Sequence, residues 1–183
     1  MKKKIFWITE TAAMLALLIA LQWVTSYVPK PIGQFITGSC VNAVLAVTAL
    51  LIGAGGGIAV AVASPVFAYL FGIAPNLVTV PVIMVGNTLF VTLLRFLYGS
   101  RLYKKAVAWI VAAVIKFAVM YALVAGVVCG LAADTLLSHG ILKAPMLNML
   151  PATFAWPQLV TALIGGGIAL LIAPSLKRAL RKD

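Results

Sequence analysis

Few side chains in this sequence could take part in chemistry. Its acids are Glu10, Asp134 and Asp183, and His139 is its only histidine. Enzymes embedded in membranes typically use His, Asp, Glu or Cys groups that hold a metal ion or move protons. Because so few such groups are present, the sequence predicts no catalytic residue and no enzyme, and we interpret His139 as an ordinary loop residue.

The two cysteines, Cys40 and Cys129, lie in apolar stretches with no second Cys or His at a spacing that suits metal ligands. We interpret both as free packing residues, and we expect neither a metal site nor a cofactor. The sequence also has no glycine-rich phosphate-binding loop, so we do not expect the chain to hydrolyse ATP.

The deepest charged residue is Lys116, which an expected helix over residues 106–133 carries about 15 Å from its start, at about 1.5 Å per residue. That depth is close to the middle of a bilayer, where a lysine costs on the order of 2.5 to 3.5 kcal/mol. We therefore expect Lys116 to face the interior of a helix bundle. There it could meet an anionic group of a ligand, donate hydrogen bonds to Asn and backbone oxygens, or lose its proton through desolvation.

Three amide side chains also lie within expected spans, namely those of Asn42, Asn87 and Gln158. Amides in hydrocarbon need hydrogen-bond partners, so each could either join helices or contact a substrate. A shared interior pocket explains several polar residues within the spans more simply than a separate structural role for each one does. Asn42, Asn87, Lys116 and Gln158 are therefore candidate substrate-binding residues.

Trp156 is a further candidate for substrate binding, because an aromatic ring near the outer end of a helix can stack on a flat ligand. Aromatic residues near helix ends also anchor proteins at the bilayer interface, and that alternative stays open.

The elements that would position these residues are membrane helices. The chain is 64% hydrophobic and 9% charged, and its mean hydropathy of +1.15 lies far outside the range of soluble domains. Apolar stretches long enough to span a bilayer follow one another with short breaks. The sequence predicts an all-α integral membrane bundle, a single transmembrane domain over residues 1–183, with six transmembrane helices at 5–28, 36–52, 54–73, 77–98, 106–133 and 152–173.

Proline and glycine mark the breaks between these helices. Pro29, Pro31 and Gly33 are expected to end the first helix, and Gly53 is expected to form a tight turn before the third. The connections at 29–35, 74–76 and 134–151 would then lie on one side of the membrane. There they could cover a site that opens outward.

The formal net charge of +11 could suggest nucleic acid, but the lysines and arginines flank the apolar stretches. Basic clusters open the chain at 2–4, surround the loop at 99–105 and close the chain at 177–182. Six helices would place these clusters together, and cytoplasmic loops carry the excess of Lys and Arg. We therefore predict that both termini are cytoplasmic and that nucleic acid is not a partner.

Ala12, Ala16 and Ala20 recur at four-residue spacing along one face of the first helix. Small residues at this interval let another helix approach closely. The stripe could receive a partner protein, or it could pack against a neighbouring helix of the same chain.

The length, the six-helix layout and this alanine stripe resemble the S components of energy-coupling-factor (ECF) transporters. The stretches at 35–42 and 64–68 and the pair Gly86-Asn87 are also similar to S components that have no settled substrate. The resemblance implies a substrate-binding subunit in the bacterial cell membrane that captures a vitamin or related micronutrient from outside. It further implies that Ala12, Ala16 and Ala20 dock on a transmembrane coupling subunit driven by two ATPases.

Two alternatives stay open: a stand-alone carrier or facilitator for a small solute, and a membrane assembly protein without a ligand. A coupled carrier typically needs an ionisable carboxylate or histidine deep in the membrane. Glu10 lies near the cytoplasmic end of its helix, and the sequence has no other acid inside an expected span. Energy for uphill transport is therefore expected to come from a partner.

Overall fold

The computed structural model describes residues 2–180, and every regular element within that range is a helix. Asp183 and the terminal basic residues Arg181 and Lys182 lie outside the described residues. In chain order the helices are α1 (Lys2–Ser26), α2 (Ile32–Leu51), α3 (Ala54–Leu70), α4 (Thr79–Leu97), α5 (Leu102–Ala122), the π-helix η1 (Leu123–Leu131), α6 (Ala133–Ser138), α7 (Met146–Phe154) and α8 (Trp156–Leu180).

Five helical stretches in the described range are long and apolar enough to cross a membrane. They correspond to α1, α2, α4, α5 continued by η1, and α7 followed by α8. The apolar helix α3 is shorter, at 17 residues, or about 26 Å at 1.5 Å per residue. The protein is thus an all-helical, multi-pass membrane bundle, and a sixth span through α3 stays a prediction.

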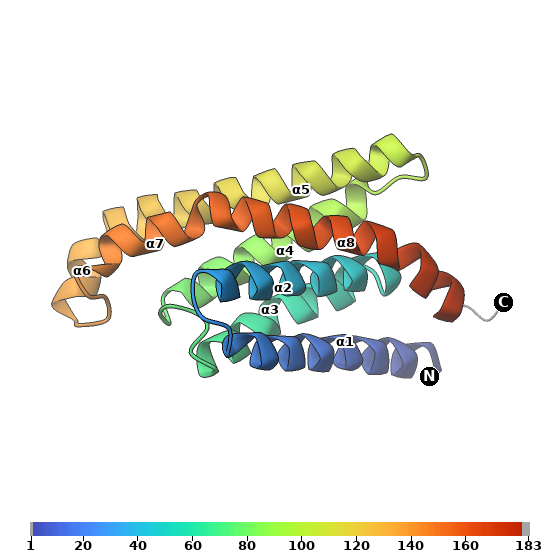
Figure 1. Cartoon of the computed structure of the whole chain (residues 1–183), viewed down its shortest axis with the longest axis horizontal. Helices are drawn as coiled ribbons and strands as arrows, with labels where there is room; N and C mark the ends of the chain where they lie inside the picture. The colour runs from blue at the N-terminus through green and yellow to red at the C-terminus, as the bar shows by residue number, and fades with distance from the viewer. Residues whose placement is uncertain (1, 181–183) are drawn as a thin grey trace.

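The long helices lie side by side, with α1 along one edge of the bundle and α5 along the opposite edge (Figure 1). The most extensive contact joins α2 to α8, while α4 packs between α3 and α5. The start of α1, the end of α8 and the α2–α3 and α4–α5 connections gather at one end of the bundle (Figure 1). We call this the basic end, because Lys104, Lys105 and Lys177 lie there.

The α2–α3 turn has the tight form that the sequence predicts. Gly53 has φ 108° and ψ 178°, a conformation that L side chains rarely adopt. Its amide N–H donates to the carbonyl oxygen of Thr48 over 3.3 Å, which closes the end of α2. The next helix can therefore begin at Ala54 and return through the bundle.

Close packing of α2 against α8 fixes which residues of the two helices lie opposite one another. A Cβ atom at Gly165 would lie 2.4 Å from the Ser39 carbonyl oxygen and 2.7 Å from the Ala43 amide nitrogen. Only glycine lets the two backbones approach this closely. Asn42 is consequently held beside Thr161, within hydrogen-bond distance.

The expectation of a long loop over residues 134–151 is wrong. Helix α6 begins inside the fifth expected span, and α7 occupies 146–154. Proline breaks the interior of a helix, but here Pro145 is the N-cap of α7 and Pro157 is the second residue of α8. Proline suits the start of a helix because its missing N–H has no intrahelical partner there.

Candidate functional site

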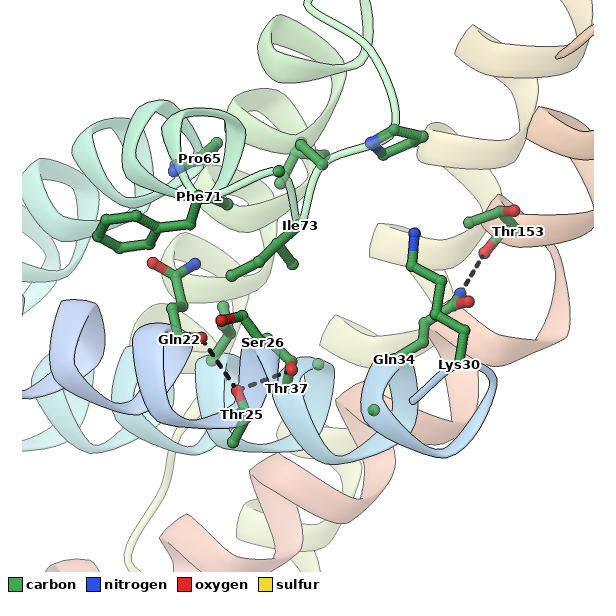
Figure 2. A pocket seen from close by; sticks show the side chains of 18 of the residues that line it. Gln22, Thr25, Ser26, Lys30, Gln34, Thr37, Pro65, Phe71, Ile73 and Thr153 are labelled. Carbon is green, nitrogen blue, oxygen red and sulfur yellow. Dashed lines mark hydrogen bonds between the residues drawn. The ribbon is translucent and has the colours of Figure 1, made fainter. Parts of the chain in front are cut away.

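A cavity of about 520 Å³ opens at the end of the bundle opposite the basic end. Its mouth is bordered by the α1–α2 loop and the α3–α4 loop, and its walls come from α1, α2, α3, α4, α7 and α8 (Figure 2). Lys116 is its one lining residue from α5. The volume falls in the range of small-molecule sites, which is about 300 to 1,000 Å³.

Lys116 forms the floor of this cavity together with two asparagines. Its Nζ atom donates a hydrogen bond to Oδ1 of Asn42 over 2.6 Å and another to Oδ1 of Asn87 over 2.7 Å. The ring of Phe90 lies below, with its centroid 5.4 Å from Nζ. Lys116 is only 2% exposed, so these contacts replace most of the water that a lysine would otherwise bind.

The lysine fixes the orientation of both amides, because an ammonium group only donates hydrogen bonds. Each asparagine must therefore present its oxygen to Lys116 and direct its nitrogen elsewhere. Nδ2 of Asn42 donates to the Gly38 carbonyl oxygen over 2.8 Å and lies 3.4 Å from Thr161 Oγ1. Nδ2 of Asn87 is buried and has no hydrogen-bond partner among residues 2–180.

Two further polar atoms around the cavity are buried without a partner in the described part of the chain, namely Oε1 of Gln22 and Oγ of Ser64. Buried polar groups are nearly always hydrogen-bonded, and one left unpaired costs about 1 to 3 kcal/mol. Gln22, Ser64 and Asn87 all line the cavity. A molecule bound there could supply the missing partners.

Hydrogen bonds between helices hold the mouth of the cavity in shape. Thr37 in α2 donates to Thr25 in α1 over 2.7 Å, and Gln34 in α2 donates to the Thr153 carbonyl oxygen in α7 over 3.3 Å (Figure 2). These contacts connect α2 to α1 on one side of the mouth and to α7 on the other. They hold these three helices in place next to the two loops that border the mouth.

The charges that line the cavity are all positive. Lys116 lies at the floor and the exposed Lys30 at the mouth, and the described lining residues include neither Asp nor Glu. The acids that the structure describes, Glu10 and Asp134, lie in α1 and α6, away from this lining. The field inside the cavity consequently favours a ligand with negative charge.

Four of the five residues named as substrate-binding candidates from the sequence line this one cavity: Asn42, Asn87, Lys116 and Gln158. Trp156 does not. It is 61% exposed and packs on Phe35, with the ring centroids 5.4 Å apart. Its position outside the lining suits the alternative of an anchor at the membrane interface.

Gln22 and Ser64 were missed by the sequence analysis. A lone glutamine near the end of a helix gives no pattern that separates a cavity position from a solvated one. Serine in a helix usually bonds to a carbonyl oxygen of its own preceding turn, so its residue type predicts no ligand contact. Both residues become noticeable only when burial and hydrogen bonding are known.

The alanine stripe lies on the outside of the bundle. Ala12, Ala16 and Ala20 are all exposed, whereas Thr11 and Leu18 on the inner face of α1 are buried. The alternative that these alanines pack against a neighbouring helix of the same chain is therefore wrong. A surface of small side chains along a membrane helix is left open for close approach by another helix.

The remaining chemical groups are dispersed. Within the described range there is no cluster of three or more His, Cys, Asp or Glu side chains suited to a metal ion. His139 is exposed, and its Nδ1 lies 2.8 Å from the Thr135 carbonyl oxygen of the same helical segment. Cys40 in α2 and Cys129 in η1 are free thiols.

A protein-family model described as the substrate-specific component of ECF transporters matches residues 10–176. The matched range includes all the helices except the first residues of α1 and the last residues of α8. No match was found among curated proteins or among solved structures.

Proposed function

The chain belongs to the family of substrate-specific components of ECF transporters, and from that premise we propose that it captures a vitamin or related micronutrient for import. It is a membrane subunit of a transporter, and members of this family are not enzymes. We also propose where the substrate binds, from which side of the membrane it enters and which subunits the chain works with. We further propose the bacterial cell membrane as its location.

The observation that carries the proposal is the cavity itself, and in particular its floor. Lys116, Asn42 and Asn87 come from three helices and meet at 2.6 Å and 2.7 Å in the interior of the bundle. Next to them lies space for a small molecule, together with buried polar atoms that residues 2–180 leave without partners. We assign substrate binding to Asn42, Asn87, Lys116 and Gln158, with Gln22 and Ser64 as additions.

The direction of access follows from the distribution of charge. The cavity opens at the end opposite the basic end, and cytoplasmic loops carry the excess of Lys and Arg. We therefore place the cavity mouth outside the cell and both termini inside. A substrate would enter between the α1–α2 and α3–α4 loops.

The exposed face of α1 is the proposed docking surface for the transmembrane coupling subunit. Ala12, Ala16 and Ala20 form an exposed stripe of small side chains there. Close backbone approach is the main source of contact between helices in lipid, where burial of apolar side chains gains little. Two ATPase subunits bound to the coupling subunit would supply the energy.

Reconstitution in liposomes tests this proposal. The chain should accumulate radiolabelled micronutrients only when the coupling subunit, both ATPases and ATP are present, and an ATPase variant unable to hydrolyse ATP should abolish uptake. Uptake by the chain alone would instead show a stand-alone carrier. A complex that neither binds nor transports any micronutrient would contradict the proposal in favour of an assembly protein.

A further inference from the structure

We infer that the substrate carries a carboxylate, which binds at the cavity floor against Lys116 and Asn87; this inference rests on the proposed function. It names the chemical class of the substrate.

The described lining of the cavity carries positive charge without a counter-ion. Lys116 is 2% exposed and is contacted by two neutral amides. The described lining contains Lys30 and Lys116 but no acid that could balance them. A buried cation without a counter-ion destabilises the folded protein, because no nearby opposite charge offsets the loss of its hydration. A ligand with one negative charge beside Nζ would supply the counter-ion.

The cavity also has hydrogen-bond donors without acceptors in the described part of the chain. An ammonium group has three N–H donors, and the asparagine oxygens receive two of those of Lys116. Nδ2 of Asn87 adds two N–H donors for which the residues 2–180 provide no acceptor. The hydroxyl of Ser64, also buried and unpaired within that range, can donate as well. The floor thus offers free donors and needs acceptors.

A carboxylate matches this arrangement because its two oxygens accept several hydrogen bonds and donate none. A cationic ligand would place like charges together, and an amide ligand would leave the charge of Lys116 unbalanced. A phosphate monoester carries about −1.5 to −2 charges at neutral pH. One buried lysine does not balance that charge, since Lys30 is exposed at the mouth.

The walls define the rest of the ligand. They are largely apolar, with Val41, Ile83, Leu150 and Phe154 among the lining residues. The amide of Gln22, one turn before the end of α1, offers a hydrogen bond near the mouth. The expected ligand is therefore a small carboxylic acid with an apolar or ring-shaped body and a polar group at its far end.

Matched pairs of compounds test the inference directly. Thermal unfolding of the detergent-purified chain is measured with nicotinate and nicotinamide, pantothenate and pantothenol, biotin and biotinamide, and lipoate and lipoamide. Ligand that binds the folded state raises the unfolding temperature by mass action. At least one acid should bind, and its neutral counterpart should bind at least tenfold more weakly.

Two variants test whether the preference for the acid arises at the cavity floor. Asn87→Asp puts a carboxylate beside Lys116, where it should form an ion pair and keep the protein folded. The new carboxylate should repel the acidic ligand and weaken its binding at least tenfold. Lys116→Met removes the charge and should abolish the difference between acid and neutral compound. The matched controls are Asn148→Asp and Lys143→Met, which change exposed residues outside the lining and should bind as the unaltered chain does.

The outcomes separate this inference from the function on which it rests. Three results would overturn the inference that the substrate carries a carboxylate. They are equal binding of the acid and its neutral counterpart, an acid preference that survives in both floor variants, and no binding by any acid up to millimolar concentration. The proposed function is judged independently, by co-purification with the coupling subunit and by ATP-dependent uptake of neutral or cationic micronutrients. Uptake of a neutral compound alone would refute the inference and leave the function standing.

Discussion

The Nζ atom of Lys116 donates a hydrogen bond to Oδ1 of Asn42 over 2.6 Å, although 74 positions separate the two residues in the sequence. The same Nζ atom donates to Asn87, 29 positions away. Helices α2, α4 and α5 are therefore joined at one level of the bundle by a single ammonium group. That junction both closes the cavity below and supplies its charge.

Replacing Asn42 with alanine should destabilise the fold. The change removes one of the two acceptors of Lys116 and the bond to the Gly38 carbonyl oxygen. A buried group that loses its partner costs about 1 to 3 kcal/mol, more when it is charged. The midpoint of thermal unfolding in detergent should fall, whereas Asn148→Ala at an exposed position should leave it unchanged. An unchanged midpoint in Asn42→Ala would show that Lys116 is satisfied in another way.

Replacing Gly165 with alanine should also destabilise the fold, but through packing. The added methyl group would meet the α2 backbone at Ser39 and Ala43, 2.4 Å and 2.7 Å away. Forced overpacking of this kind typically costs about 1 to 3 kcal/mol. Gly126→Ala is the matched control, because a Cβ there has no heavy atom within 4 Å. Similar midpoints for the two variants would contradict the close α2–α8 contact.

Much of the cavity lining at the floor could be predicted from the polar residues within the expected helices. Polar side chains inside expected apolar spans were enough to select Asn42, Asn87, Lys116 and Gln158, which line one cavity in the structure. Their pairing could not be predicted, because it depends on how far each helix is rotated and shifted against its neighbours. The same limit applies to Gln22 and Ser64, whose residue types are common in helices that bind nothing.

The fold was predicted well where apolar runs are long and poorly where prolines are dense. Gly53 marked the α2–α3 turn correctly, since its positive φ is a local requirement. Around α7 the sequence was ambiguous, because proline both ends helices and begins them. In the structure Pro145 is the N-cap of α7, which packs against α8 and η1.

Replacing Ala16 with leucine should block docking on the coupling subunit. The exposed alanine stripe allows close approach, and a leucine in its middle would hold the partner helix away. The amount of coupling subunit that co-purifies should fall at least tenfold, while ligand-dependent thermal stabilisation is retained. Ala118→Leu, at an exposed position on α5, is the control. Normal co-purification of Ala16→Leu would remove the stripe from the interface, and loss of both properties would indicate misfolding.

Cysteine labelling should reveal the orientation of the chain. In a background with Cys40 and Cys129 replaced by alanine, Lys143→Cys should react with a membrane-impermeant maleimide in intact cells. Lys104→Cys should react only after the cells are permeabilised, because it lies at the basic end, which we place inside. Both lysines are exposed, so access depends on the side of the membrane. The reverse pattern would invert the proposed topology and place the cavity mouth in the cytoplasm.

The most direct test of the account is to identify what the cavity holds when the protein is purified from cells grown in rich medium. Small molecules released on denaturation are quantified by mass spectrometry for three proteins: the unaltered chain, Ile83→Trp and Ile36→Trp. Ile83→Trp places an indole ring in the cavity, whereas Ile36→Trp adds the same ring at an exposed position outside the cavity lining. We predict one micronutrient near equimolar amount from the unaltered chain and from Ile36→Trp, and its loss from Ile83→Trp. Equal amounts from all three proteins, or no enriched compound from any of them, would contradict substrate capture in this cavity.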